Sequence, residues 1–164
     1  MAKRWSKLQS RLYNVIDPSI KFQIHCVLYE MNSNDGWHSN KLPRYFITIG
    51  KDIVFDYPKD FTYEGCKSAS CYPYLTDMEE ISCLIEEYIQ RPIEELMEDF
   101  VNDNWGLTDI LRVCDKRVGK RRLRKLRDTV TDEKLLKIIS LRLNNNKSVL
   151  SDLIRKQRGN GNEF

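Results

Sequence analysis

Long hydrophobic runs are missing from this 164-residue sequence. No stretch approaches the ~20 apolar residues that a membrane-spanning helix needs. The N-terminus, MAKRWSKLQSRLYNV, carries cations but no continuous apolar segment, so it lacks the pattern of a signal peptide. We therefore expect a cytoplasmic protein that does not engage a membrane.

Glycine and histidine are scarce, with seven and two copies. So few glycines leave little material for a phosphate-binding loop, and the sequence contains no P-loop, dinucleotide-binding turn, nucleophile elbow or zinc-protease motif. The paired glutamates at 79–80, 86–87 and 94–95 fall on the polar sides of predicted helices, which is typical of a solvated face. The sequence gives little support for an enzyme, and we expect no cofactor.

The cysteines are odd in number, which argues against a disulfide framework and for reduced thiols. Three of them fall on apolar stripes, where cysteine behaves as a small core residue. These three are Cys26, Cys83 and Cys114.

The other two cysteines, Cys66 and Cys71, have four residues between them and no second matched pair. Small side chains in a loop are the favoured interpretation, although this spacing lies within the range of half a zinc site. Cys66, Cys71 and His38 are the metal or catalytic candidates of an alternative hypothesis. In it the protein is an enzyme whose site lies between a sheet and the irregular segment 58–75. Asp35 and Asp56 also lie near predicted strand ends.

The first half of the chain changes from a helical to an alternating pattern. Apolar residues at three- and four-residue steps predict a helix from Trp5 that ends before Pro18. Alternation then predicts strands over 20–28, 44–49 and 53–57, the last two joined as a hairpin through Gly50. Antiparallel pairing with one packed and one wetter face is expected.

The second half has helical patterns only. We predict N-caps at Thr76, Thr108 and Ser148, a helix with Pro92 in its first turn and another that starts at Thr131, each with an apolar stripe. The prediction is an α+β fold: an N-terminal helix and a small antiparallel sheet of at least three strands, followed by a helical C-terminal half. With 41% hydrophobic residues, the chain can form one domain over residues 1–158, followed by a flexible tail at 159–164.

Charge is distributed unevenly along this helical half. Residues 112–127 hold nine cations and one acid, a net charge of +8, whereas residues 77–103 hold ten acids and one base, a net charge of −9. The overall charge of +3 conceals this asymmetry.

The basic run contains two apolar stripes that one straight helix cannot bury against the same surface. Leu107 to Val118 carry one stripe, and Leu123, Leu126 and Val130 carry the other. Gly119 lies between them, so we predict a break or sharp kink there. The six cations that follow cover most of the second helix: Lys120, Arg121, Arg122, Arg124, Lys125 and Arg127.

Two interpretations of these cations remain open. They pack beside the acidic helices of 77–103 and are neutralised internally, or they contact an anionic partner, either a nucleic acid or a protein. The run lacks the interleaved aromatics of base-stacking surfaces, and no helix-turn-helix signature is present. The preferred hypothesis is a non-enzymatic binding or regulatory module that engages an anionic protein or nucleic-acid surface through Lys120–Arg127.

Several segments resemble a family of small, uncharacterised bacterial proteins. They are WSKL at 5–8, YFITI at 45–49, DYPKDF at 56–61, WGLTDILR at 105–112 and DKRVGKRRL at 115–123. The resemblance spans roughly residues 4–127. It implies a bacterial, cytosolic protein with one fold, and it transfers no activity and no catalytic residue.

Overall fold

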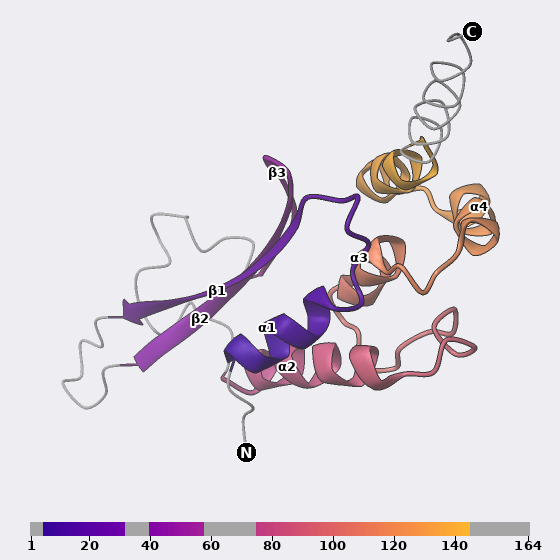
Figure 1. Cartoon of the computed structure of the whole chain (residues 1–164). Coiled ribbons are helices and arrows are strands. Elements are labelled where there is room, and N and C mark those ends of the chain that lie inside the picture. Colours follow the sequence, from indigo (N-terminus) through magenta and orange to yellow (C-terminus); the bar gives the residue numbers. More distant parts are fainter. Residues whose placement is uncertain (1–4, 32–39, 58–74, 145–164) are drawn as a thin grey trace, which may run out of the picture.

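The computed structural model describes residues 5–31, 40–57 and 75–144 of the chain. Its elements run in the order α1 (Trp5–Tyr13), β1 (Phe22–Met31), β2 (Asn40–Ile49), β3 (Asp52–Tyr57), α2 (Leu75–Gln90), α3 (Leu107–Cys114) and α4 (Lys120–Thr129). Residues 133–144 form a further helix. Figure 1 shows the sheet on one side of the molecule and the later helices on the other. The predicted α+β fold is confirmed.

The sheet is antiparallel with strand order β1-β2-β3. Phe22 pairs with Ile49 and Ile24 with Ile47, so their side chains share one face. Gly50 connects β2 to β3 with a φ of 63°, a left-handed conformation that glycine adopts without steric cost. β1 extends past the predicted end at residue 28, and β2 begins four residues before the predicted start at 44.

Helices α1 and α2 cover the apolar face of the sheet. Ile24 and Ile47 from the sheet, Leu12 from α1 and Ile81 from α2 are essentially inaccessible to solvent and belong to one core cluster. A polar contact also joins α1 to the sheet. The Gln9 side chain donates to the Ile24 carbonyl at 2.8 Å, which fixes α1 along β1. Buried residues of the later helices belong to the same core cluster.

Residues 92–106 form a series of turns, so the predicted helix that starts at Pro92 is wrong. The amides of Glu95 and Glu98 bond to carbonyls three residues earlier, at 3.1 and 3.0 Å, instead of making helical bonds four residues back. The buried Arg112 side chain occupies the carbonyls of Leu96 and Glu98, at 2.7 and 2.8 Å. These two carbonyls therefore accept from the Arg112 guanidinium and not from backbone amides of a helix.

Two predicted caps and one predicted core residue also need correction. Thr76 lies inside α2, which begins at Leu75. Thr108 lies in the first turn of α3, and the Asp103 carboxylate caps that helix by accepting from the amides of Leu107 and Thr108 at 3.1 and 2.7 Å. Cys83 is exposed on α2, whereas Cys114 is buried as predicted and Cys26 is half-buried.

The break in the basic run is confirmed, and it starts earlier than expected. α3 ends at Cys114, residues 115–119 are not helical, and α4 begins at Lys120 with Gly119 as its N-cap. Val118 and Leu123, which belong to the two predicted stripes, are both buried. The helix predicted after Thr131 is present over 133–144, while the one predicted after Ser148, the tail 159–164 and the segment 58–74 lie outside the described residues. The proposed domain bounds of 1–158 stay a prediction.

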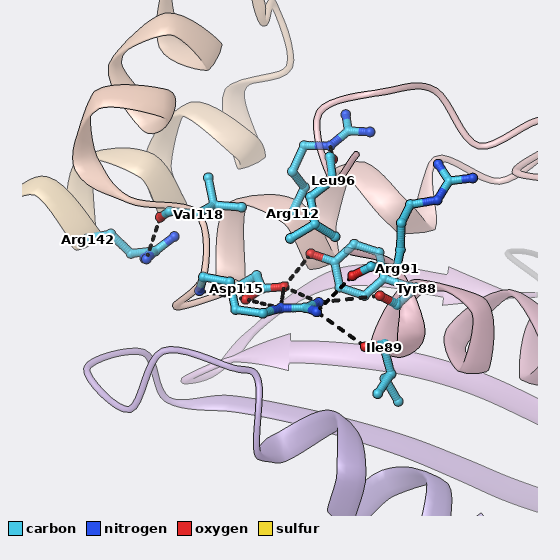
Figure 2. Close-up of polar contacts among 9 residues, drawn as sticks. Tyr88, Ile89, Arg91, Leu96, Arg112, Asp115, Val118 and Arg142 are labelled. Carbon is cyan, nitrogen blue, oxygen red and sulfur yellow. Dashed lines mark hydrogen bonds and ion pairs between the residues drawn. The ribbon is translucent and has the colours of Figure 1, made fainter. Parts of the chain in front are cut away.

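Asp115 is the first residue of this break, and its side chain has no exposed surface. Figure 2 shows the polar contacts around its carboxylate. The carboxylate accepts hydrogen bonds from the Tyr88 hydroxyl at 2.8 Å and from the Arg117 guanidinium at 2.7 and 2.9 Å. Arg117 also donates to the carbonyls of Ile89 and Arg91, both at 3.2 Å, where α2 ends. Burial and the Asp115 charge raise the pKa of Tyr88 well above 10, so its hydroxyl stays a donor.

Arg142, on the helix 133–144, attaches this helix to the same break. Its buried guanidinium donates to the carbonyls of Val113 and Val118 at 3.0 and 3.1 Å, on either side of Asp115. It also donates to the Asp17 carboxylate at 3.0 Å. Burial acts to raise the pKa of Asp17, but hydrogen bonds from Ser19 and Arg142 outweigh it and hold that pKa below 3.8. The Asp17 carboxylate is therefore ionised at neutral pH.

Among the described residues, no helix combines the length and the apolar character that crossing a membrane requires.

We expect Asp115→Asn to destabilise the fold by about 3 kcal/mol, because Arg117 then keeps its charge without a buried counter-charge. Urea unfolding followed by circular dichroism measures the difference. Asp128→Asn is the matched control, since the Asp128 side chain is 70% exposed. It should change the free energy of unfolding by less than about 0.5 kcal/mol. Equal effects of the two variants would contradict the central role of Asp115.

Candidate functional site: the basic helix α4

Helix α4 lies at the edge of the molecule, with α3 between it and the sheet (Figure 1). Only one of its side chains, that of Leu123, is buried, and Leu126 is half-buried against the core. Five of its six cations are exposed and Arg122 is half-buried. The predicted contact residues are therefore gathered on one solvent-facing helix.

The cations of α4 divide into two groups around the helix axis. At ~100° per residue, Leu123 and Leu126 face the core and the cations cover the remaining arc. Arg121, Arg122 and Lys125 fall on one side of this arc, which we call the hollow triad. Lys120, Arg124 and Arg127 fall on the other side, which we call the ridge triad.

The hollow triad lines an open hollow of ≈ 390 Å³ together with Gly119. Among the residues that the structure describes, no carboxylate contributes to this lining. Gly119, the N-cap of α4, has no side chain to accept hydrogen bonds from the first-turn amides of the helix. The hollow is therefore lined by cationic side chains beside the positive end of a helix dipole.

The two other prominent cations of the basic run, Arg112 and Arg117, serve the fold. Arg112 is 5% exposed and donates to two carbonyls and to Asp109, and Arg117 pairs with Asp115. The carboxylate partners of these two residues are Asp109 and Asp115, which lie outside the acidic segment 77–103.

Internal neutralisation does not extend to α4 within the part of the chain that the structure describes. There the one ion pair of its six cations joins Arg127 to its neighbour Asp128 at 3.5 Å, with both side chains at least half exposed. A surface pair of this kind contributes little to stability. The acidic segment 77–103 makes no ion pair with α4 among these residues.

The residues of the alternative enzyme hypothesis are only partly placed. Cys66, Cys71, His38 and Asp35 lie outside the described residues. Within the described ranges, no group of three metal-binding side chains was found. Asp56 lies on β3, where its carboxylate forms a bidentate pair with Arg44.

Two hydroxyl groups lie within hydrogen-bond distance of each other, one on β2 and one on α2. The Tyr45 hydroxyl and the Ser82 hydroxyl are 2.7 Å apart. Burial raises the pKa of Tyr45 to about 12 and also raises that of Cys26, which is hydrogen-bonded to it. The Tyr45 hydroxyl and the Cys26 thiol are therefore neutral at physiological pH, which suits a structural contact better than acid–base chemistry.

Comparison with family models gives a match over residues 4–72 and 73–143. The chain belongs to the SF0329 protein family. The match confirms the family resemblance and extends it beyond residue 127 to include all of α4 and nearly all of the helix 133–144. Searches among curated proteins and among solved structures gave no match.

Thiol reactivity should follow burial in this protein. Burial raises the pKa of Cys114 to about 12, and its thiol has no exposed surface, so we expect it to resist iodoacetamide at pH 8. Exposed Cys83 should be modified in the native protein. Peptide mass spectrometry reads each site separately, and the same reaction in urea shows that Cys114 is modified once unfolded. Rapid native modification of Cys114 would contradict its burial.

Proposed function

We propose that this protein is a non-enzymatic binding module whose helix α4 contacts the phosphate backbone of a nucleic acid. The observation that carries the proposal is the contrast between α4 and its surroundings. Arg112 and Arg142 are buried and Arg117 is half-buried, and all three donate to carboxylates and carbonyls. Five of the six cations of α4 are exposed instead, and the six make one exposed ion pair among the described residues. We therefore expect these charges to contribute little to the stability of the fold.

The order of charges in α4 supports this proposal further. Its first turn holds Lys120, Arg121 and Arg122 and no acid. Cations at a helix N-terminus oppose the helix dipole, at a cost of about 0.3–1 kcal/mol each. Local sequence rules are broken in this way mostly at functional sites. A bound anion would compensate for both the repulsion among these cations and the uncapped helix end.

The character of the exposed surface favours nucleic acid over an acidic protein. Protein interfaces are usually held by buried apolar or aromatic anchors, and the two leucines of α4 face the core instead. Four of the six cations are arginines, whose planar donors match phosphate oxygens. Without aromatic or amide side chains in α4 to read bases, the expected contacts are with the backbone and independent of sequence.

We also propose that the protein is bacterial and lies in the cytosol, where nucleic acid is accessible. The described cysteines, Cys26, Cys83 and Cys114, are free thiols, which fits a reducing compartment.

Reversing three exposed charges of α4 should abolish nucleic-acid binding without unfolding the protein. The variant is Arg121→Glu, Arg124→Glu, Lys125→Glu. We expect the wild type to bind a fluorescent duplex and a single strand with affinity that falls as salt rises. A log–log slope near roughly −4 to −5 for the duplex corresponds to about five phosphate contacts. Fluorescence anisotropy over a salt series measures this slope.

The matched control reverses three exposed lysines elsewhere: Lys7→Glu, Lys21→Glu and Lys51→Glu. It makes the same change in net charge and should keep most of the affinity. If both variants lost the same amount of nucleic-acid affinity, the loss would come from the overall net charge and not from α4. No binding by the wild type at low salt would refute the nucleic-acid proposal, and binding to polyglutamate alone would point to an acidic protein instead.

Capping α4 should separate stability from binding. Gly119 has φ −70° and ψ 166°, and an added Cβ would meet no atom within 4 Å, so Asp or Asn fits there as an N-cap. Gly119→Asp and Gly119→Asn should each raise stability by a few tenths of a kcal/mol. Asp should weaken nucleic-acid binding more than Asn, because only Asp adds a negative charge to the hollow. Thermal unfolding and anisotropy measure the two effects; equal binding by both variants would argue against an anion beside Gly119.

A further inference from the structure

We infer that the hollow triad forms a site for a terminal phosphate group, so that the protein prefers nucleic-acid strands that end in a phosphate. This inference rests on the proposed function and narrows it. It starts from a difference between the two triads of α4. Arg121, Arg122 and Lys125 surround one open hollow, whereas on the other side Arg127 is paired with Asp128.

The charge in the hollow fits a phosphomonoester better than an internal phosphodiester. Three cations line it, and its described lining residues include no carboxylate. An internal phosphate of a strand carries one negative charge. A phosphomonoester carries about −1.5 to −2 at neutral pH and offers three strong acceptor oxygens, one for each side chain of the hollow triad.

The size of the hollow fits the end of a strand. At ≈ 390 Å³ it is large enough for a phosphate together with the attached sugar. Within the described part of the chain its lining has no aromatic or apolar side chain, so the base is not expected to be recognised there. Recognition of a terminal phosphate without base preference follows from this lining.

The hollow is also held in place by the fold. Arg142 bonds the carbonyl of Val118, the residue before Gly119, at 3.1 Å, and Val118 itself is fully buried. Arg122 is half-buried, which limits the freedom of its side chain. A site whose base is fixed in this way loses less entropy when a ligand binds. Lys120, Arg124 and Arg127 of the ridge triad do not line this hollow, and we expect them to contact any phosphate along the strand.

The test compares two fluorescent single strands of identical sequence, one with a 5′-phosphate and one with a 5′-hydroxyl, in anisotropy titrations of the full chain. We expect about tenfold tighter binding of the phosphorylated strand, equivalent to one additional charge-assisted hydrogen bond. The hollow variant Arg121→Gln, Arg122→Gln, Lys125→Gln should lose this preference. The ridge variant Lys120→Gln, Arg124→Gln, Arg127→Gln should bind both strands more weakly and keep the preference.

The two variants remove the same charge from the same helix, so only the position of the cations differs. Equal affinity of the wild type for the two strands, together with clear binding, would overturn this inference and leave the proposed function intact. Absence of binding to either strand would overturn the proposed function itself. A preference lost equally in both variants would also refute the hollow as its origin.

A 3′-phosphorylated strand and adenosine 5′-monophosphate complete the series. Preference for the 3′-phosphorylated strand over its hydroxyl counterpart would extend the site to both strand ends and support a phosphomonoester as its ligand. Binding of adenosine 5′-monophosphate as tight as that of the phosphorylated strand would overturn the assignment to a strand end, since a free nucleotide would then suffice.

Discussion

The buried carboxylate of Asp115 ends α3 and gives the following segment its course. Its partners come from the end of α2 and from the loop itself, and the neighbouring backbone bonds to the segment after α1 through the Asp17 amide and the Cys114 carbonyl at 2.8 Å. A completely buried charge is stable only when its oxygens are paired. Residues 115–119 therefore leave the helical path, and α4 begins in a new direction at the edge of the molecule.

Arginine has two different roles in this part of the chain. Arg112, Arg117 and Arg142 act inside the fold, because each guanidinium satisfies several carbonyls and a carboxylate at once. The arginines of α4 face solvent instead, and they crowd a helix end where positive charge is unfavourable. Burial, and not composition, separates the structural cations from those available to a partner.

Local pattern was enough to predict the three strands, the hairpin at Gly50 and the break near Gly119, because alternation and helical stripes report directly on which side chains meet the core. It failed over 92–106, where Arg112 captures carbonyls that the apolar stripe assigned to a helix. It failed again at Cys83, which lies on the exposed side of α2. Both errors come from partners or surfaces defined by residues distant in sequence.

The sequence by itself determined the α+β order, the basic helix and its six cations, since these follow from periodicity and charge along the chain. Only the tertiary structure decided which cations form ion pairs and hydrogen bonds inside the fold and which surround a hollow. The physical reason is that the electrostatic role of an arginine depends on burial and on the nearest oxygens. At Arg112 and Arg142 the most important of these belong to residues 14 or more positions away in the chain.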